Sequence, residues 1–105
     1  MKYAVVFVTA ANIKEARKIA EQVVKERLVA CVNIVEKIKS IYWWQGKIEK
    51  SHESLLIMKT RLRLAKKLIK KVKSLHSYTV PEIIFIPIID GNPDYLKWIE
   101  NETNG

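Results

Sequence analysis

Three side chains that can bind metal ions or move protons lie close together in the segment HSYTVPE, residues 76–82. His76 brings an imidazole, Tyr78 a phenol and Glu82 a carboxylate. Imidazole and carboxylate groups bind divalent cations, so His76 and Glu82 are candidate metal ligands. The alternative role of His76 is structural, because it ends a helical pattern, where the helix dipole favours a positive charge. The sequence leaves both roles open.

The single cysteine, Cys31, is a third candidate ligand. It stands between Ala30 and Val32, where a free cysteine usually packs as a small hydrophobic side chain. Its thiolate would also suit Cu(I), although one soft donor makes no site without partners. A lone cysteine excludes an internal disulfide and a CxxC metal or redox motif, which favours a reducing, cytoplasmic location.

Enzymatic motifs are missing from the sequence. It has no HExxH pair, no nucleophile elbow and no glycine-rich phosphate loop. His52 and Glu53 are adjacent, so they face opposite ways on a strand, and we predict that both lie on a hairpin surface. Lys59 or Tyr78 could serve a shared catalytic cleft, but no motif supports this alternative. We therefore expect a protein that is not an enzyme and that requires no cofactor.

Hydrophobic patterning predicts the elements of the first half of the chain. A β-branched run at residues 2–10 predicts a buried strand, and Asn12 followed by Glu15 is typical of a helix start. A second strand is predicted from residue 29 to residue 44. At about 3.3 Å per residue this strand is longer than a small domain is wide, so it must bend, bulge or protrude. Gly46 supplies a tight turn, after which the chain returns antiparallel.

The second half of the chain repeats the helix and strand. After the returning strand, which ends in SLLIMKT, apolar residues recur at helical spacing from Leu62 to Leu75 and predict a basic amphipathic helix, and a core strand follows it. Pro87 places that strand at a sheet edge or near the strand's end, and Pro93 starts a short final helix. The predicted order is βαββαβ plus a helix. The fold class is α+β, in a single domain over residues 1–105, with no membrane-spanning segment.

The chain has an excess of positive charge, +8 overall, concentrated in the basic helix. A basic stripe can follow phosphates, and a βαββαβ sheet also describes an RNA-binding module. That module needs an aromatic platform motif on a central strand, and the corresponding segment here reads QGKIEKSHES. We therefore predict a solvated helix face and no specific nucleic-acid partner.

The segment SIYWW, residues 40–44, is apolar on both faces of its strand. Ile41 and Trp43 share one face, whereas Tyr42 and Trp44 share the other. A chain of 105 residues cannot easily cover such a cluster by itself. We predict that a neighbouring subunit covers Tyr42, Trp43 and Trp44, and Trp98 of the final helix is a further predicted interface residue.

Several short segments together resemble one family. In order and spacing, the chain is similar to the CutA divalent-cation tolerance proteins in the segments ERLVACVNIV, SIYWWQGKIE, LLIMKT, HSYTVPEI and DYLKWI. The resemblance implies a ferredoxin-like βαββαβ sandwich and a homotrimer assembled like the PII signalling proteins. It also implies a role in tolerance of divalent metals, with copper or another divalent cation as the candidate ligand.

The resemblance transfers only part of the family's copper ligands. Some members have a cysteine and a second histidine where this chain has Val8 and Leu75, and proline or an acidic or amide residue where it has Ser77 and Thr79. Of that set only His76 remains, joined by our candidates Cys31 and Glu82. The main hypothesis is a trimer that binds copper at clefts between subunits, where Tyr78 and Lys59 would also contact ligand. The alternative is a PII-like signalling trimer that binds a small ligand without a metal role.

Overall fold

The computed structural model describes residues 2–103 and contains the predicted order of elements. These elements are β1 (Tyr3–Ala10), α1 (Ile13–Lys25), β2 (Cys31–Trp44), β3 (Lys47–Arg61), the 3-10 turn η1 (Leu62–Leu64), α2 (Ala65–Leu75), β4 (Ile83–Ile88) and α3 (Pro93–Glu102). The second strand begins two residues later than predicted. The predicted α+β class is confirmed.

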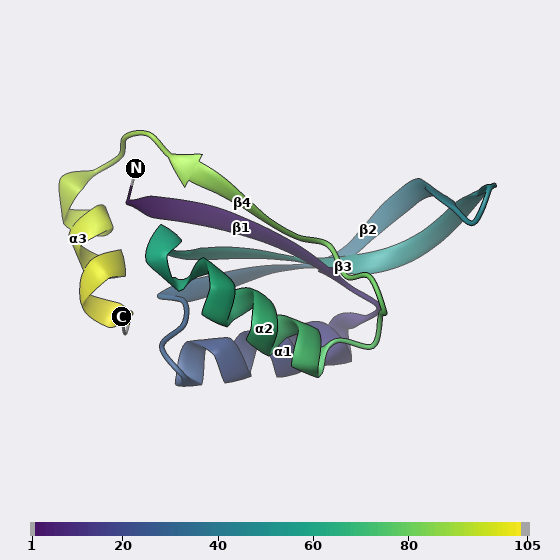
Figure 1. Ribbon diagram of the computed structural model, residues 1–105, viewed down its shortest axis with the longest axis horizontal. Coiled ribbons are helices and arrows are strands. Elements are labelled where there is room, and N and C mark those ends of the chain that lie inside the picture. The colour runs from purple at the N-terminus through teal and green to yellow at the C-terminus, as the bar shows by residue number, and fades with distance from the viewer. Residues whose placement is uncertain (1, 104–105) are drawn as a thin grey trace.

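The four strands form one antiparallel sheet in the order β2-β3-β1-β4. Helices α1 and α2 lie together on one face of this sheet, and α3 lies at one end, near the N-terminus (Figure 1). This is the ferredoxin-like arrangement of two βαβ halves. As predicted from Pro87, β4 is an edge strand and this proline is its second-last residue.

Local sequence signals start the helices where they were predicted. The Asn12 side chain accepts a hydrogen bond from the Glu15 backbone N–H at 2.8 Å, which caps α1. Helix α3 begins at Pro93, and Asn92 caps it by accepting from the backbone N–H of Asp94. These caps satisfy backbone donors that have no partner inside the helix.

The hydrophobic core lies between the sheet and the helices α1 and α2. It is made of fully buried side chains from alternate strand positions and from the inner helix faces, including Val6, Val8, Leu56, Met58, Ile19, Val23, Leu68 and Val72. The lysines of α2 lie on its outer side, where Lys66, Lys67, Lys70 and Lys73 are exposed. The prediction of a solvated basic face is therefore confirmed.

Helices α1 and α2 leave the other face of the sheet open, and among residues 2–103 only α3 packs on it, at one end (Figure 1), where Tyr95 contacts Cys31 and Glu100 accepts from the Tyr3 hydroxyl. Strand alternation places on this face the residues between the core positions, and the register aligns them across the sheet. One row contains Asn33, Ile57, Phe7 and Ile84, and the next contains Cys31, Lys59, Val5 and Ile86. We call this surface the open sheet face. It is mostly apolar, although Lys59 and Asn33 contact each other on it.

Strands β2 and β3 extend far beyond the rest of the sheet as a hairpin (Figure 1). Strand β1 ends opposite Ser54, so residues 47–53 pair with β2 alone in the described part of the chain. The register shifts between Val35 and Ile38, which is a β-bulge. The molecule measures 44 × 25 × 23 Å. The prediction that this strand must bend, bulge or protrude is confirmed, since it both bulges and protrudes.

The hairpin closes through the tight turn that Gly46 predicted. Gln45 and Gly46 have φ values of 51° and 79°, and Trp44 pairs with Lys47 across the two-residue loop. Two successive positive φ values are those of a type I′ turn, which matches the natural twist of paired strands. Glycine takes such a conformation without steric cost, whereas Gln45 does not.

Candidate functional site

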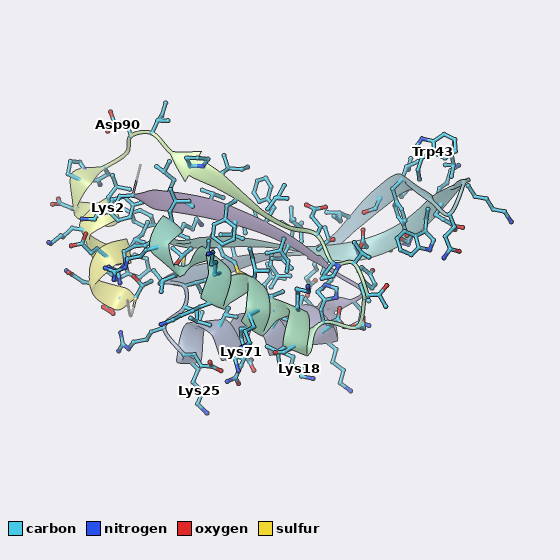
Figure 2. The ribbon with its side chains drawn as sticks, viewed as in Figure 1. Lys2, Lys18, Lys25, Trp43, Lys71 and Asp90 are labelled. Atoms are coloured by element: carbon cyan, nitrogen blue, oxygen red, sulfur yellow. The ribbon has the colours of Figure 1, made fainter. Side chains whose placement is uncertain are left out.

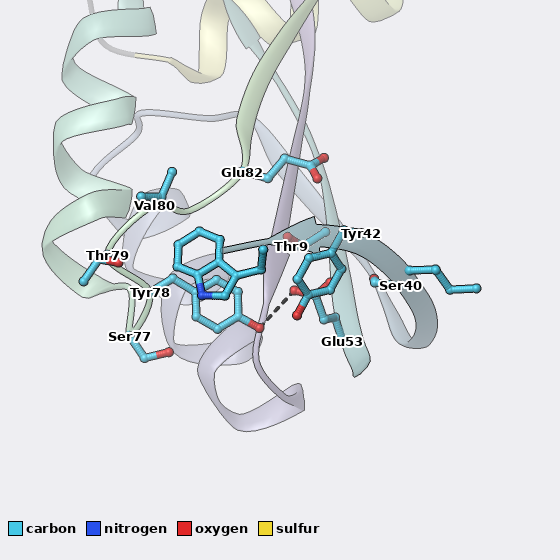
Figure 3. A pocket seen from close by; sticks show the side chains of 11 residues that line it. Thr9, Ser40, Tyr42, Glu53, Ser77, Tyr78, Thr79, Val80 and Glu82 are labelled. Atoms are coloured by element: carbon cyan, nitrogen blue, oxygen red, sulfur yellow. Dashed lines mark hydrogen bonds between the residues drawn. The ribbon is translucent and has the colours of Figure 1, made fainter. Parts of the chain in front are cut away.

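A pocket of about 700 Å³ lies where the base of the hairpin meets the loop that connects α2 to β4 (Figure 3). Its lining combines aromatic, aliphatic, hydroxyl and carboxylate side chains. The lining residues are Thr9, Ser40, Ile41, Tyr42, Trp44, Glu53, Ser77, Tyr78, Thr79, Val80 and Glu82. This volume is in the range of small-molecule binding sites.

A hydrogen bond between Tyr78 and Glu53 forms one wall of the pocket (Figure 3). The Tyr78 hydroxyl donates to Glu53 Oε2 at 2.9 Å. Burial and this hydrogen bond to the carboxylate both raise the pKa of Tyr78. The phenol therefore remains protonated at physiological pH and acts as a hydrogen-bond donor, not as a base.

The prediction that Glu53 lies on a hairpin surface is wrong. Only 8% of Glu53 is exposed, whereas its neighbour His52 is exposed. Adjacent residues of a strand face opposite sides of the sheet, and Glu53 is on the side that Tyr78 covers. The sequence separates these two residues by 25 positions, so their contact has no local signal.

His76 is the C-cap residue of α2, and its imidazole is buried between α1 and the end of β1. The ring Nε2 lies 2.6 Å from the carbonyl oxygen of Thr9, and Nδ1 accepts from the backbone N–H of Tyr78 at 3.1 Å. This pattern describes a neutral ring with its proton on Nε2. Both nitrogens are engaged, so His76 holds the 76–78 segment against β1 and offers no free lone pair in this conformation.

Glu15 secures the same segment from α1. Its two carboxylate oxygens accept from the backbone N–H groups of Ala11 and Ser77, and Oε1 lies 3.5 Å from Nδ1 of His76. Burial alone would raise the pKa of Glu15, but hydrogen bonds from Ser77 and Ala11 outweigh it, and the pKa lies below its ordinary value. The loop that carries Tyr78 is thus fixed to α1 by Glu15 and to β1 by His76.

The other predicted site residues lie away from the pocket. Cys31 is partly exposed on the open sheet face, with its Sγ 3.6 Å from the hydroxyl of Tyr95 in α3. Burial and this contact raise the pKa of Tyr95 to about 12. Lys59 pairs with Cys31 across the strands and contacts Asn33. Of the predicted ligand contacts, Tyr78 lines the pocket and Lys59 does not, and the predicted metal ligand Glu82 also lines it. Ligand and metal binding by these residues stays a prediction.

The predicted metal ligands His76, Cys31 and Glu82 do not form one cluster. Cys31 is aligned with Val5 of β1, whereas His76 contacts Thr9, which lies about 13 Å further along that strand at about 3.3 Å per residue. Among residues 2–103, no group of three His, Cys, Asp or Glu side chains is close enough to hold a metal ion. Copper binding by these residues stays a prediction, and it would need ligands from another subunit.

The predicted interface residues are exposed at both ends of the molecule. Trp43 is 72% exposed, and Tyr42 and Trp44 each expose more than two fifths of their surface. Trp43 lies at the far end of the hairpin (Figure 2). Trp98 is partly exposed on α3, at the opposite end, where it packs on Tyr95 with ring centroids 5.4 Å apart. The described part of the chain thus leaves a large share of these aromatic rings exposed.

Sequence reasoning missed Glu53 and Thr9, and it placed Tyr42 and Trp44 at an interface without recognising that they also line a pocket. An acidic residue directly before the apolar run SLLIM was the available signal for Glu53. A carboxylate that begins such a run is costly to bury unless it has a partner.

The fold and the pocket define a ferredoxin-like α+β protein with a binding pocket at the base of an exposed hairpin. A family model described as "CutA1 divalent ion tolerance protein" matches residues 4–102. The chain belongs to the CutA1 divalent ion tolerance protein family, as the sequence resemblance predicted.

Relatives with known names support this assignment. The divalent-cation tolerance protein CutA of Thermus thermophilus is 48% identical over 99 residues, which cover 94% of this chain and 96% of the relative. Protein CutA 1, chloroplastic, from Oryza sativa is also 48% identical over 99 residues, and here the match covers 94% of this chain but 56% of the relative. The chain thus spans about half the length of the plant relative.

Solved structures confirm the fold. The divalent cation tolerance protein from Thermus thermophilus superimposes with a TM-score of 0.95 at 47% identity, covering 97% of this chain and 99% of that one. None of the helices in residues 2–103 has the length and apolar character that crossing a membrane requires.

Proposed function

We propose that this protein works as a homotrimer in the tolerance of divalent cations, with copper as the main candidate ion. In this proposal the pocket at the hairpin base lies at the boundary between subunits and is the ligand site. Family membership supports the role in divalent-cation tolerance. The single cysteine supports a reducing, cytoplasmic location.

The uncovered apolar surface is the observation that carries the proposal of a trimer. The open sheet face and the hairpin leave the large apolar side chains Ile41, Trp43, Trp44, Ile48, Ile84 and Ile86 exposed. These side chains lie on both faces of the hairpin and on β4, and exposed apolar surface of this extent is typical of protein interfaces. The aromatic hairpin and the aromatic residues of α3, Tyr95 and Trp98, lie at opposite ends of the molecule (Figure 1). Two different surfaces that bind each other form a head-to-tail contact, and we propose that this contact closes as a ring of three.

A second copy of this chain is the occupant that fits the exposed surfaces best. Both edge strands, β2 and β4, have free hydrogen-bonding edges in the described chain, to which a neighbouring strand can be added. The hairpin projects beyond the rest of the sheet, so in this proposal it pairs with such an edge on another protomer.

A metal role would depend on this assembly. Glu82 is exposed at the pocket and can offer a carboxylate, whereas the imidazole of His76 is engaged at both nitrogens. Copper at a cleft between subunits would therefore combine Glu82 with donors from a neighbour, or would require the 76–78 segment to rearrange.

The alternative is a PII-like trimer that binds a small ligand without a metal. The pocket favours it, because aromatic and aliphatic side chains surround a few polar groups. An RNA-binding role has less support, since the charged helix is a solvated face and the module's aromatic motif is missing.

Native mass spectrometry of protein purified without added metal tests the proposal. We expect a trimer under these conditions and one Cu²⁺ per subunit after addition of a slight excess of copper. A monomer would refute the assembly. A trimer that gains no copper, and whose stability copper does not change, would refute the metal role and leave the small-ligand alternative.

A further inference from the structure

We propose that the pocket at the hairpin base binds an organic ammonium cation, a positively charged nitrogen on an apolar or aromatic body. This inference rests on the ligand role that the proposed function gives to the pocket, and it names the class of ligand. Three features carry it: the charge of the lining, the buried carboxylate of Glu53, and the aromatic rings among the lining residues.

The pocket carries only negative charge, although the chain as a whole is strongly basic. Two of its lining residues, Glu53 and Glu82, have carboxylates, and no lysine, arginine or histidine is among the described lining residues. The net charge of the chain is +8. A concave site lined by one sign of charge concentrates ions of the opposite sign. The pocket thus selects cations over the anions that the outer surface attracts.

Glu53 is a buried charge without a cationic partner. Only 8% of its surface is exposed, and its hydrogen-bond partner is the neutral hydroxyl of Tyr78. No ion pair joins it to a basic side chain in the part of the chain that the structure describes. Buried charges are normally paired because desolvation is costly. A bound ammonium group would supply the missing positive charge.

The aromatic residues of the pocket suit an organic cation. Tyr42, Trp44 and Tyr78 all line it. In Figure 3 the ring of Tyr42 lies beside the Glu53 carboxylate, close to the Tyr78 hydroxyl. Aromatic faces attract ammonium groups, and the attraction is larger where water is excluded. Sites that combine aromatic rings with carboxylates therefore recognise alkylated ammonium ions.

The remaining lining residues favour an organic cation over a hydrated metal ion. Ile41 and Val80 contribute apolar surface, and the pocket volume of about 700 Å³ is far larger than one ion needs. A divalent ion requires several convergent oxygen, nitrogen or sulfur donors, and residues 2–103 provide no group of three. An alkyl or aryl body attached to the ammonium group would fill the apolar part of the pocket.

Isothermal titration calorimetry with benzyltrimethylammonium tests the inference, and 3-phenylpropionate serves as the anionic control. We expect saturable binding of the cation and none of the anion. Glu53→Gln keeps an acceptor for the Tyr78 hydroxyl but removes the charge, so it should weaken binding at least about tenfold. Glu82→Gln, at an exposed position that does not endanger folding, should weaken it less.

Glu49→Gln is the matched control, because it makes the same change on the same strand outside the pocket lining. It should leave the affinity unchanged. The inference is overturned if the cation does not bind, if the anion binds equally well, or if Glu53→Gln loses no more affinity than Glu49→Gln. Sedimentation of the same samples separates the two proposals: an intact trimer that fails to bind refutes only this inference, whereas a monomer that binds refutes only the trimer.

Discussion

The double substitution Trp43→Asp and Trp44→Asp should dissociate the trimer while leaving each protomer folded. Both rings are on the hairpin beyond the end of β1, where they contribute nothing to the buried core. Asp at these positions would place a charge on a surface that must lose its water in an interface. The unassembled protomer should tolerate the same charge, because the positions are open to solvent.

The size of the effect follows from the exposed surface. Trp43 and Trp44 are 72% and 44% exposed. With about 200 Å² for each tryptophan side chain, this leaves on the order of 230 Å² of ring surface for a neighbour to cover. At about 25 cal/mol per Å², burial of that area contributes at most about 6 kcal/mol per subunit.

The concentration at which the trimer dissociates converts this energy into a measurement. If a third of this burial energy is realised in each of the three subunits, the double substitution lowers the free energy of trimer dissociation by about 6 kcal/mol in total. The half-dissociation concentration varies as the square root of the trimer dissociation constant, so it should rise about a hundredfold. Sedimentation equilibrium over a dilution series measures this shift.

Val24→Asp is the control, because Val24 is 41% exposed on α1, on the opposite side of the sheet from the open face. It should not change the dissociation concentration. A wild-type chain that is a folded monomer, or a double variant that remains trimeric over the same dilution series, would refute the reasoning.

Three further predictions concern the polar contacts and the basic helix. His76→Ala removes the buried ring that bonds to Thr9 and Tyr78 and should lower the free energy of unfolding by about 2–4 kcal/mol in urea denaturation; an unchanged value would mean that the ring has no structural role. The pKa of Glu100 falls from 4.5 to about 2 in the folded protein, mainly through the hydrogen bond from Lys2. The stability from this carboxylate should therefore be complete above pH 4.5 and decline as pH falls towards 2, and Glu100→Gln should flatten that decline in acid-denaturation curves. Helix α2 should bind RNA and DNA weakly and without sequence preference, with binding lost by about 200 mM salt in fluorescence anisotropy; selective binding at that salt would support the RNA-binding alternative.

The order of elements could be predicted from the sequence because its signals are local. Asn12 marks a helix start because its side chain accepts a hydrogen bond from a backbone N–H of the first turn. Pro93 marks another, because proline has no N–H that would need a partner there. Gly46 marks the hairpin turn, and Pro87 marks an edge strand. The excess length of the second strand also required the protruding hairpin, since an extended chain has a fixed rise per residue.

The candidate site was predicted only in part, because its residues come from segments far apart in the chain. Tyr78 and Glu82, which are close in the sequence, do line the pocket, and their contact with a ligand stays a prediction. The position of His76 at a helix end was visible in the sequence, but the direction of its ring was not, so the metal-ligand and structural hypotheses could not be separated. That ring turns inward to the carbonyl of Thr9, which is 67 residues away in sequence.

The sequence by itself therefore determined the βαββαβ order, the basic helix face and the exposed aromatic hairpin, since each depends on spacing, capping or charge within a few residues. Only the tertiary structure decided which groups meet. Glu53 is buried in the pocket because Tyr78, which follows the C-terminal end of α2, bonds to it. Cys31 and His76 are apart because Cys31 is aligned with Val5 and His76 contacts Thr9, four residues further along β1. The turn at Gly46 aligns β2 with β3, but β1 pairs with β3 and β4, which are far away in the sequence, and signals within a few residues do not determine those pairings.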